Sequence, residues 1–132
     1  MSWEKVEEYI EIIYELEKNN KIANTGKIAS KLEIKPGSVT EFLQKLEKMG
    51  LIEYEPYYGV KLTSKGEKLA KNLERKHRIL AKFFFEVLGV DKEIAERDAC
   101  EIEHHVSKET IEKLIEFIEN IKGRKKWKEA MC

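Results

Sequence analysis

The feature that most constrains the fold is a pair of short amphipathic segments separated by a tight turn. Apolar side chains recur at three- and four-residue steps over 26–32 and again from Pro36 to about Met49, which predicts two helices. Pro36 suits the first turn of the second helix, and Gly50 suits its C-terminal end. Two helices in this order, the second with small polar residues near its start, predict a helix-turn-helix motif.

A β-hairpin is predicted directly after the second of these helices. Segments 51–55 and 60–63 have the composition of short strands, and the sequence Pro-Tyr-Tyr-Gly at 56–59 predicts the turn between them. An amphipathic helix over 3–18 precedes the whole motif. Three helices followed by a hairpin are typical of a winged helix-turn-helix domain, and a small α+β domain without a DNA role is the alternative.

The rest of the chain is predicted to be helical. A capping box, Ser64-Lys-Gly-Glu67, opens a long helix that extends to about Leu88. Asp91 is expected to cap the next helix, and Ser107 to cap a final helix that ends at Gly123.

These elements predict a mainly α chain with two domains. We expect a winged helix-turn-helix DNA-binding domain over 1–63, an all-helical domain over 64–122 and a basic tail over 123–132. The tail is expected to be solvated, with phosphate binding as the alternative. The Phe83–Phe85 triplet covers more helix surface than one core face needs, so a neighbouring helix or a second subunit must cover the remainder.

Composition narrows the class of protein. The chain has 132 residues, 42% of them hydrophobic and 38% charged, with a formal net charge of zero, which predicts a soluble, helix-rich protein without a global basic field. Two cysteines, Cys100 and Cys132, do not form a disulfide framework. No apolar run is long enough for a membrane span, so we expect a cytoplasmic protein whose Cys100 is a thiol.

A candidate metal site lies between Asp98 and Val106. Cys100, Glu103 and His104 have the i, i+3, i+4 spacing that places side chains on one face of a helix. A thiolate, a carboxylate and an imidazole presented together suit a first-row transition ion such as iron, manganese, cobalt, nickel or zinc. The alternative is a small buried cysteine beside a solvated Glu-His face.

Several short motifs then occur in order along the chain, from about residue 4 to about residue 121. They are Glu8-Tyr-Ile-Glu11, Val39-Thr-x-x-x-x-Lys-Leu46, Gly50-Leu-Ile52, Leu62-Thr-x-x-Gly66, Arg75-Lys-His77 and Glu101-Ile-Glu-His-His105. Together they resemble the DtxR/MntR family of metal-dependent transcriptional repressors, in its short two-domain, manganese-repressor-like form.

The resemblance implies a helical metal-binding and dimerisation domain after the winged helix, with divalent iron or manganese as corepressor. Cobalt, nickel or zinc would be substitutes. It also implies a homodimer on double-stranded DNA with a palindromic operator, because two winged domains must face successive major grooves. The metal ligands that it implies are Glu8, Glu11, His77, Cys100, Glu103 and His104.

The ligand pattern mixes two branches of that family. Manganese-type members resemble this chain in the acids of the first helix, whereas iron-type members resemble it in having a cysteine at position 100. The chain has Ala81 where some members of the family carry a carboxylate, and it has Glu96 where iron-type members carry a histidine. Taken singly, Glu8 and Glu11 also fit a solvated acidic face, and His77 an ordinary surface position.

The exposed side of the second motif helix is the predicted DNA reader. Its amide, hydroxyl and charged side chains suit base edges and phosphates, with Gln44 able to pair with adenine. The predicted reading residues are Ser38, Thr40, Glu41, Gln44 and Lys45, and the predicted backbone contacts are Lys27, Lys35, Lys48, Tyr57, Tyr58 and Lys61. For each residue alone, an ordinary solvated side chain is the alternative, and Glu41 is unexpected beside phosphates.

Two other functions remain as alternatives. One is a winged-helix regulator that responds to a small molecule or to thiol redox state rather than to metal. The other is an enzyme with Cys100 as nucleophile and His104 as base, four residues apart on a helix. The sequence offers neither an oxyanion hole nor an orienting third residue for this enzyme, so we expect a regulator and not an enzyme.

Overall fold

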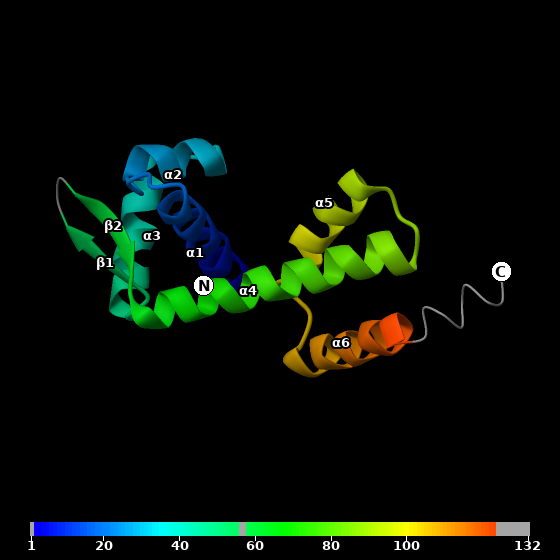
Figure 1. Ribbon diagram of the computed structural model, residues 1–132. Helices are drawn as coiled ribbons and strands as arrows, with labels where there is room; N and C mark the ends of the chain where they lie inside the picture. The colour runs from blue at the N-terminus through cyan, green and yellow to red at the C-terminus, as the bar shows by residue number, and fades with distance from the viewer. Residues whose placement is uncertain (1, 56–57, 124–132) are drawn as a thin grey trace. The chain divides into compact units, whose positions relative to one another are not determined.

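The computed structural model describes residues 2–55 and 58–123, and its chain forms two compact units, Met1–Glu74 and Arg75–Cys132 (Figure 1). Each unit has its own apolar core, and helix α4 (Ser64–Lys82) contributes residues to both units. None of the described helices is long and apolar enough to cross a membrane. The division falls inside α4, so the domain boundary placed at 63/64 from the sequence stays a prediction.

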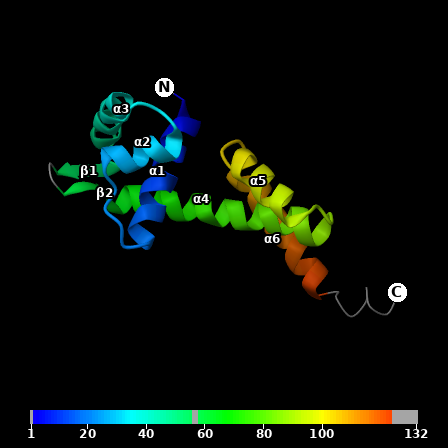
Figure 2. The same cartoon turned by 90° about the horizontal axis from the view of Figure 1, so that it is seen from above.

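The first unit has the predicted order of three helices and a hairpin. Its elements before α4 are α1 (Trp3–Lys18), α2 (Thr25–Leu32), α3 (Pro36–Lys48), β1 (Ile52–Glu55) and β2 (Gly59–Leu62). The strands pair antiparallel, with Ile52 opposite Leu62 and Glu55 opposite Gly59. The hairpin lies beside α3 in both views (Figure 1 and Figure 2). The winged helix-turn-helix is therefore confirmed as the architecture of this unit.

Apolar stripes on the three helices form one core in this unit. Ile10 and Ile13 of α1, Ile28 of α2 and Leu46 of α3 are all fully buried. The rings of Tyr9 and Phe42 stack against each other with centroids 4.4 Å apart. The helical spacing read from the sequence thus predicts the buried face of each helix.

The hairpin is tied to the helices through its backbone. Glu17 on α1 accepts a hydrogen bond from the Leu62 N–H at 2.9 Å, and Glu47 on α3 accepts one from the Tyr54 N–H at 3.1 Å. Ala23 pairs with β2 as an isolated bridge, which the sequence did not predict. These contacts tie the hairpin to α1, to α3 and to the segment between α1 and α2.

The start of α4 differs by one residue from the prediction. Thr63, not Ser64, is the N-cap, because its hydroxyl accepts the Gly66 N–H at 3.2 Å and its carbonyl accepts the Glu67 N–H at 2.8 Å. The same hydroxyl donates to the Gly50 carbonyl at 2.6 Å. One side chain therefore caps α4 and joins it to the end of α3.

The second unit is helical, as predicted, but its long helix is not uniform. After α4 come a π-helix, η1 (Phe83–Val87), then α5 (Lys92–Ile102) and α6 (Lys108–Gly123). Figure 1 shows α5 and α6 on opposite sides of the C-terminal half of α4. Their shared core contains the following buried residues: Leu80, Ala81, Ala99 and Ile111.

The π-helix interrupts the regular helix that was predicted to continue to Leu88. The Leu88 N–H bonds to the Phe83 carbonyl at 3.1 Å, which is the i→i−5 bond of a π turn. The wider turn lets Phe83 pack edge-on against Phe117 of α6, at 6.1 Å between centroids, while Phe85 stays 49% exposed. Packing of the aromatic triplet thus accompanies the change in helical pitch.

The two predicted caps of the later helices differ in outcome. The Ser107 hydroxyl accepts the Thr110 N–H at 3.2 Å, so the predicted cap of α6 is confirmed. Asp91 occupies the N-cap position of α5, but its side chain makes no capping hydrogen bond.

Gly66 is required by the close approach of α4 to Leu51, because a Cβ at this position would lie 2.1 Å from the Leu51 carbonyl oxygen. We expect Gly66→Ala to lower the free energy of unfolding by about 1–3 kcal/mol, since the backbone must shift to relieve the overlap. Urea unfolding measures this loss. Gly37→Ala is the matched control, because a Cβ at Gly37 meets nothing within 4 Å. Equal unfolding midpoints for wild type and Gly66→Ala would contradict the packing described here.

Candidate metal centre and DNA-binding helix

Glu103 is a fully buried carboxylate at the C-terminal end of α5. Ala95 and Ala99 let α5 pack closely, because both are buried and small. The helix ends at Ile102, but Glu103 keeps a helical backbone and its N–H bonds to the Ala99 carbonyl at 2.9 Å. Glu103 is 0% exposed. The packing of α5 therefore delivers an ionisable group into a site without water contact.

His77, near the middle of α4, lies between two carboxylates. Its Nδ1 is 2.9 Å from Oε2 of Glu103, and its Nε2 is 2.5 Å from Oε2 of Glu96. The hydrogen bond to Glu103 is the main cause that raises the pKa of His77 from 6.5 to about 9, and the bond to Glu96 adds to it. Partial burial acts in the opposite direction. The two carboxylates therefore favour a positive charge at the His77 ring.

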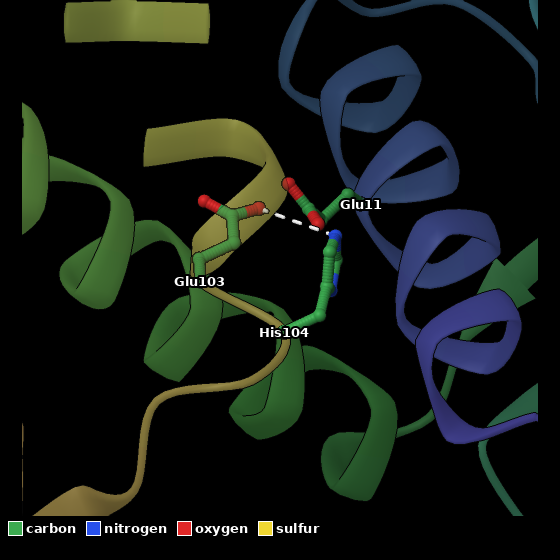
Figure 3. A group of neighbouring side chains, drawn as sticks. All are labelled: Glu11, Glu103 and His104. Carbon is green, nitrogen blue, oxygen red and sulfur yellow. Dashed lines mark ion pairs between the residues drawn. The ribbon is translucent and has the colours of Figure 1, made fainter. Parts of the chain in front are cut away.

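The second oxygen of Glu103 has a different environment. Among the described residues, no hydrogen bond reaches its Oε1, although the atom is buried. The Nε2 atom of His104 lies 3.7 Å from this oxygen, as the dashed line in Figure 3 marks. A buried carboxylate oxygen without a hydrogen bond is costly unless a cation compensates it.

This donor set fits a divalent metal ion. Glu103 supplies a buried oxygen anion, and His77 and His104 supply imidazole nitrogens on either side of its carboxylate. Carboxylate and imidazole donors suit manganese, iron and zinc. The Lys76 ammonium donates to the Val106 carbonyl at 2.9 Å, which fixes the loop that follows His104.

The other predicted ligands lie on two helices. Cys100 is exposed on α5, and Glu8 and Glu11 are half-buried on α1 of the first unit. The helix was expected to carry Cys100, Glu103 and His104 together, but it ends at Ile102 because the His105 N–H bonds to the Ile102 carbonyl at 2.8 Å in a tighter turn. The structure thus brings together His77, Glu103 and His104 within the second unit.

Sequence reasoning did not assign a role to Glu96. Its signal was the spacing of Glu96, Cys100 and Glu103 at i, i+4 and i+7, which places all three along one side of α5. Glu96 was noted only as a departure from iron-type relatives, since those members carry a histidine there.

The DNA-facing candidate, α3, is clearly two-sided. Its inner face is buried and consists of Val39, Phe42, Leu43 and Leu46. The predicted reading residues Ser38, Thr40, Glu41, Gln44 and Lys45 are all exposed, as is Lys48. The Thr40 hydroxyl donates to the Pro36 carbonyl at 3.2 Å, which ties this side chain back to its own helix.

The residues predicted to contact the DNA backbone belong to the same unit as α3. Lys27, Lys35 and Lys61 are exposed, and Tyr58 on the hairpin turn is 70% exposed. Tyr57 lies outside the described residues, as does the tail from 124 to 132.

A winged helix-turn-helix unit followed by a helical unit with a buried carboxylate–histidine cluster defines a class of metal-responsive DNA-binding proteins. The family model for the iron dependent repressor N-terminal DNA binding domain matches residues 1–60. The model for the iron dependent repressor metal binding and dimerisation domain matches residues 63–127.

Individual relatives agree with these matches. The chain is 40% identical over 129 residues to the regulator MntR of Bacillus subtilis, covering 96% of this chain and 90% of MntR. It is 39% identical over 122 residues to an uncharacterised helix-turn-helix regulator of Methanocaldococcus jannaschii, covering 92% and 98%. The solved structure of the manganese regulator SloR superposes with a TM-score of 0.74 at 33% identity, covering 86% of this chain but only 53% of SloR.

The chain belongs to the iron-dependent repressor family, also called the DtxR/MntR family, of metal-dependent transcriptional regulators. This membership supports the metal-dependent interpretation over a regulator that responds to a small molecule or to thiol redox state. The family consists of DNA-binding regulators rather than enzymes.

Proposed function

We propose that the protein is a cytoplasmic, homodimeric repressor whose affinity for a palindromic operator is controlled by Mn²⁺ or Fe²⁺. The observation that carries this proposal is the Glu103 carboxylate, which is buried between two histidines with one oxygen lacking a hydrogen bond among the described residues. A divalent cation would compensate that charge, so metal binding and the packing of the second unit would be coupled.

The ligand set of this proposal comes from two sources. His77, Glu103 and His104 are supported by their mutual distances. Glu8 and Glu11 are supported by the sequence resemblance, and Cys100 by that resemblance and by its spacing from Glu103 and His104 in the sequence. Together they give a carboxylate- and imidazole-rich set with one thiolate, which favours Mn²⁺ or Fe²⁺ and tolerates Co²⁺, Ni²⁺ or Zn²⁺.

The metal would act as a corepressor by shifting populations. In the proposed ligand set, one cation would offset the mutual repulsion of the carboxylates that α1 and the second unit would contribute. The form of the dimer whose winged units match successive major grooves would then become more populated.

Metal dependence is tested by titrating chelator-stripped protein, under anaerobic conditions, on the promoter DNA upstream of its own gene. We expect Mn²⁺ or Fe²⁺ to raise the affinity at least about tenfold, or roughly 1.4 kcal/mol of coupling. Glu103→Gln and His104→Ala should lose this response, because each removes a proposed ligand. His105→Ala is the matched control, since this neighbouring histidine is exposed and is not a proposed ligand. A full metal response in Glu103→Gln would refute the ligand assignment.

We assign base reading to the exposed face of α3. Gln44 is one turn beyond Glu41 on that face and can pair with adenine in the major groove. Gln44→Ala should therefore weaken binding to the specific operator by about 1–3 kcal/mol while leaving binding to unrelated DNA unchanged.

Lys45→Ala provides the comparison for that experiment. If Lys45 contacts phosphate, its loss should weaken binding to all sequences. It should also reduce the slope of log affinity against log salt concentration by about one. Fluorescence anisotropy at several salt concentrations separates the two effects. Equal losses of Gln44→Ala on specific and unrelated DNA would contradict base reading by this residue.

We assign dimerisation to the exposed aromatic surface of the second unit. Phe117 on α6 packs against Phe83 yet remains 49% exposed, and Leu88 at the end of η1 is 58% exposed. Large apolar side chains exposed on one helical unit are typical of an interface with a second copy.

Phe117→Glu should therefore shift the protein from dimer to monomer, because the interface would have to bury a charge. Sedimentation equilibrium measures the change in association. Ile22→Glu is the control, since Ile22 is a similarly exposed apolar residue of the first unit. An unchanged dimer in Phe117→Glu would exclude α6 from the interface.

A further inference from the structure

The two ring nitrogens of His77 have different carboxylate partners. Nδ1 faces Glu103, which is 0% exposed, whereas Nε2 faces Glu96, whose side chain is 52% exposed. The two nitrogens of an imidazole point in divergent directions, so one metal ion binds only one of them. Only the nitrogen beside Glu103 points toward the candidate metal centre.

We propose that Glu96 is a positioning residue of the metal centre. It accepts the Nε2–H hydrogen bond of His77, fixes the ring orientation and tautomer, and so presents Nδ1 to the metal. Ligating histidines commonly donate their second N–H to a carboxylate in this way, which orients the ring and raises its basicity. The inference rests on the proposed function, because it takes His77 as a metal ligand.

The local structure supports this role. Glu96 and Glu103 lie seven residues apart, two turns of α5, so one helix places carboxylates at both nitrogens of the same ring. An open groove of about 400 Å³ borders His77 and Glu96, and Ala81 and Ala95 also line it. Small side chains at these two positions leave room for the Glu96 side chain to reach across from α5 to α4.

Glu96 is not placed to be a ligand of the same ion. Its Oε2 lies 2.5 Å from Nε2 of His77, on the side of the ring away from the nitrogen that faces Glu103. Its side chain is half exposed, so it contributes little to packing. The effect of removing it would therefore reach the metal through the orientation of His77 alone.

The experiment measures Zn²⁺ affinity by chelator competition in wild type, Glu96→Ala, Glu96→Gln and the control Asp98→Asn. Asp98 is an exposed acid on the same helix, so its neutralisation controls for a general loss of charge. Glu96→Ala should lower the affinity by about 10–100-fold. Glu96→Gln should lose less, because its amide oxygen can still accept the Nε2–H bond, and Asp98→Asn should match wild type.

Nitrogen-15 NMR of the Zn²⁺-loaded proteins supplies a readout that a merely structural role would not change. We expect wild-type His77 to show a metal-bound Nδ1 and a slowly exchanging Nε2–H proton, and Glu96→Ala to lose that protection. A wild-type affinity and spectrum in Glu96→Ala would overturn the inference while leaving the metal site intact. Loss of one bound ion per chain in Glu96→Ala would overturn it as well, because Glu96 would then be a ligand. If wild type bound no metal through His77, the proposed function and the inference would fail together.

Discussion

The second unit depends on how the buried charge of Glu103 is compensated. A carboxylate removed from water is tolerated only when hydrogen bonds or opposite charges replace its hydration. His77 satisfies one oxygen at 2.9 Å, and the other oxygen lies 3.7 Å from Nε2 of His104. The cluster therefore connects the middle of α4 to the loop after α5, and the same carboxylate that must be compensated is the best anionic ligand of the unit.

In the first unit, the packing holds α3, the proposed DNA-reading helix, beside the β1–β2 hairpin. Its core buries one face of each helix and leaves the polar face of α3 exposed. Carboxylates of Glu17 and Glu47 bind the backbone of the two strands, so hydrogen bonds attach the hairpin in addition to the packing of Ile52 and Val60 in the core. The exposed residues of α3 take no part in this core.

Periodicity in the sequence was enough to predict this architecture, because apolar spacing is a local signal. The helices, the hairpin and the buried faces followed from it. The π turn at Phe83 did not, since it accompanies packing on Phe117, which is distant in the sequence. The N-cap of α4 was predicted at Ser64, one residue after the observed cap at Thr63, because serine and threonine are both good N-cap residues. Glu96 was missed because its partner, His77, lies on another helix.

The buried carboxylate and the exposed thiol of the proposed ligand set would differ in the free energy that they gain from metal binding. Cys100 is exposed, so its thiolate can be hydrated when no metal is bound, whereas Glu103 is 0% exposed and has no such alternative. The gain from adding a cation is therefore expected at the carboxylate, because one of its buried oxygens has no hydrogen bond among the described residues. Oxygen and imidazole donors would then determine most of the binding free energy, and the thiolate would adjust the choice among manganese, iron and softer ions. Replacing the exposed Cys100 would then change the choice of metal, whereas replacing the buried Glu103 would change the packing of the unit itself.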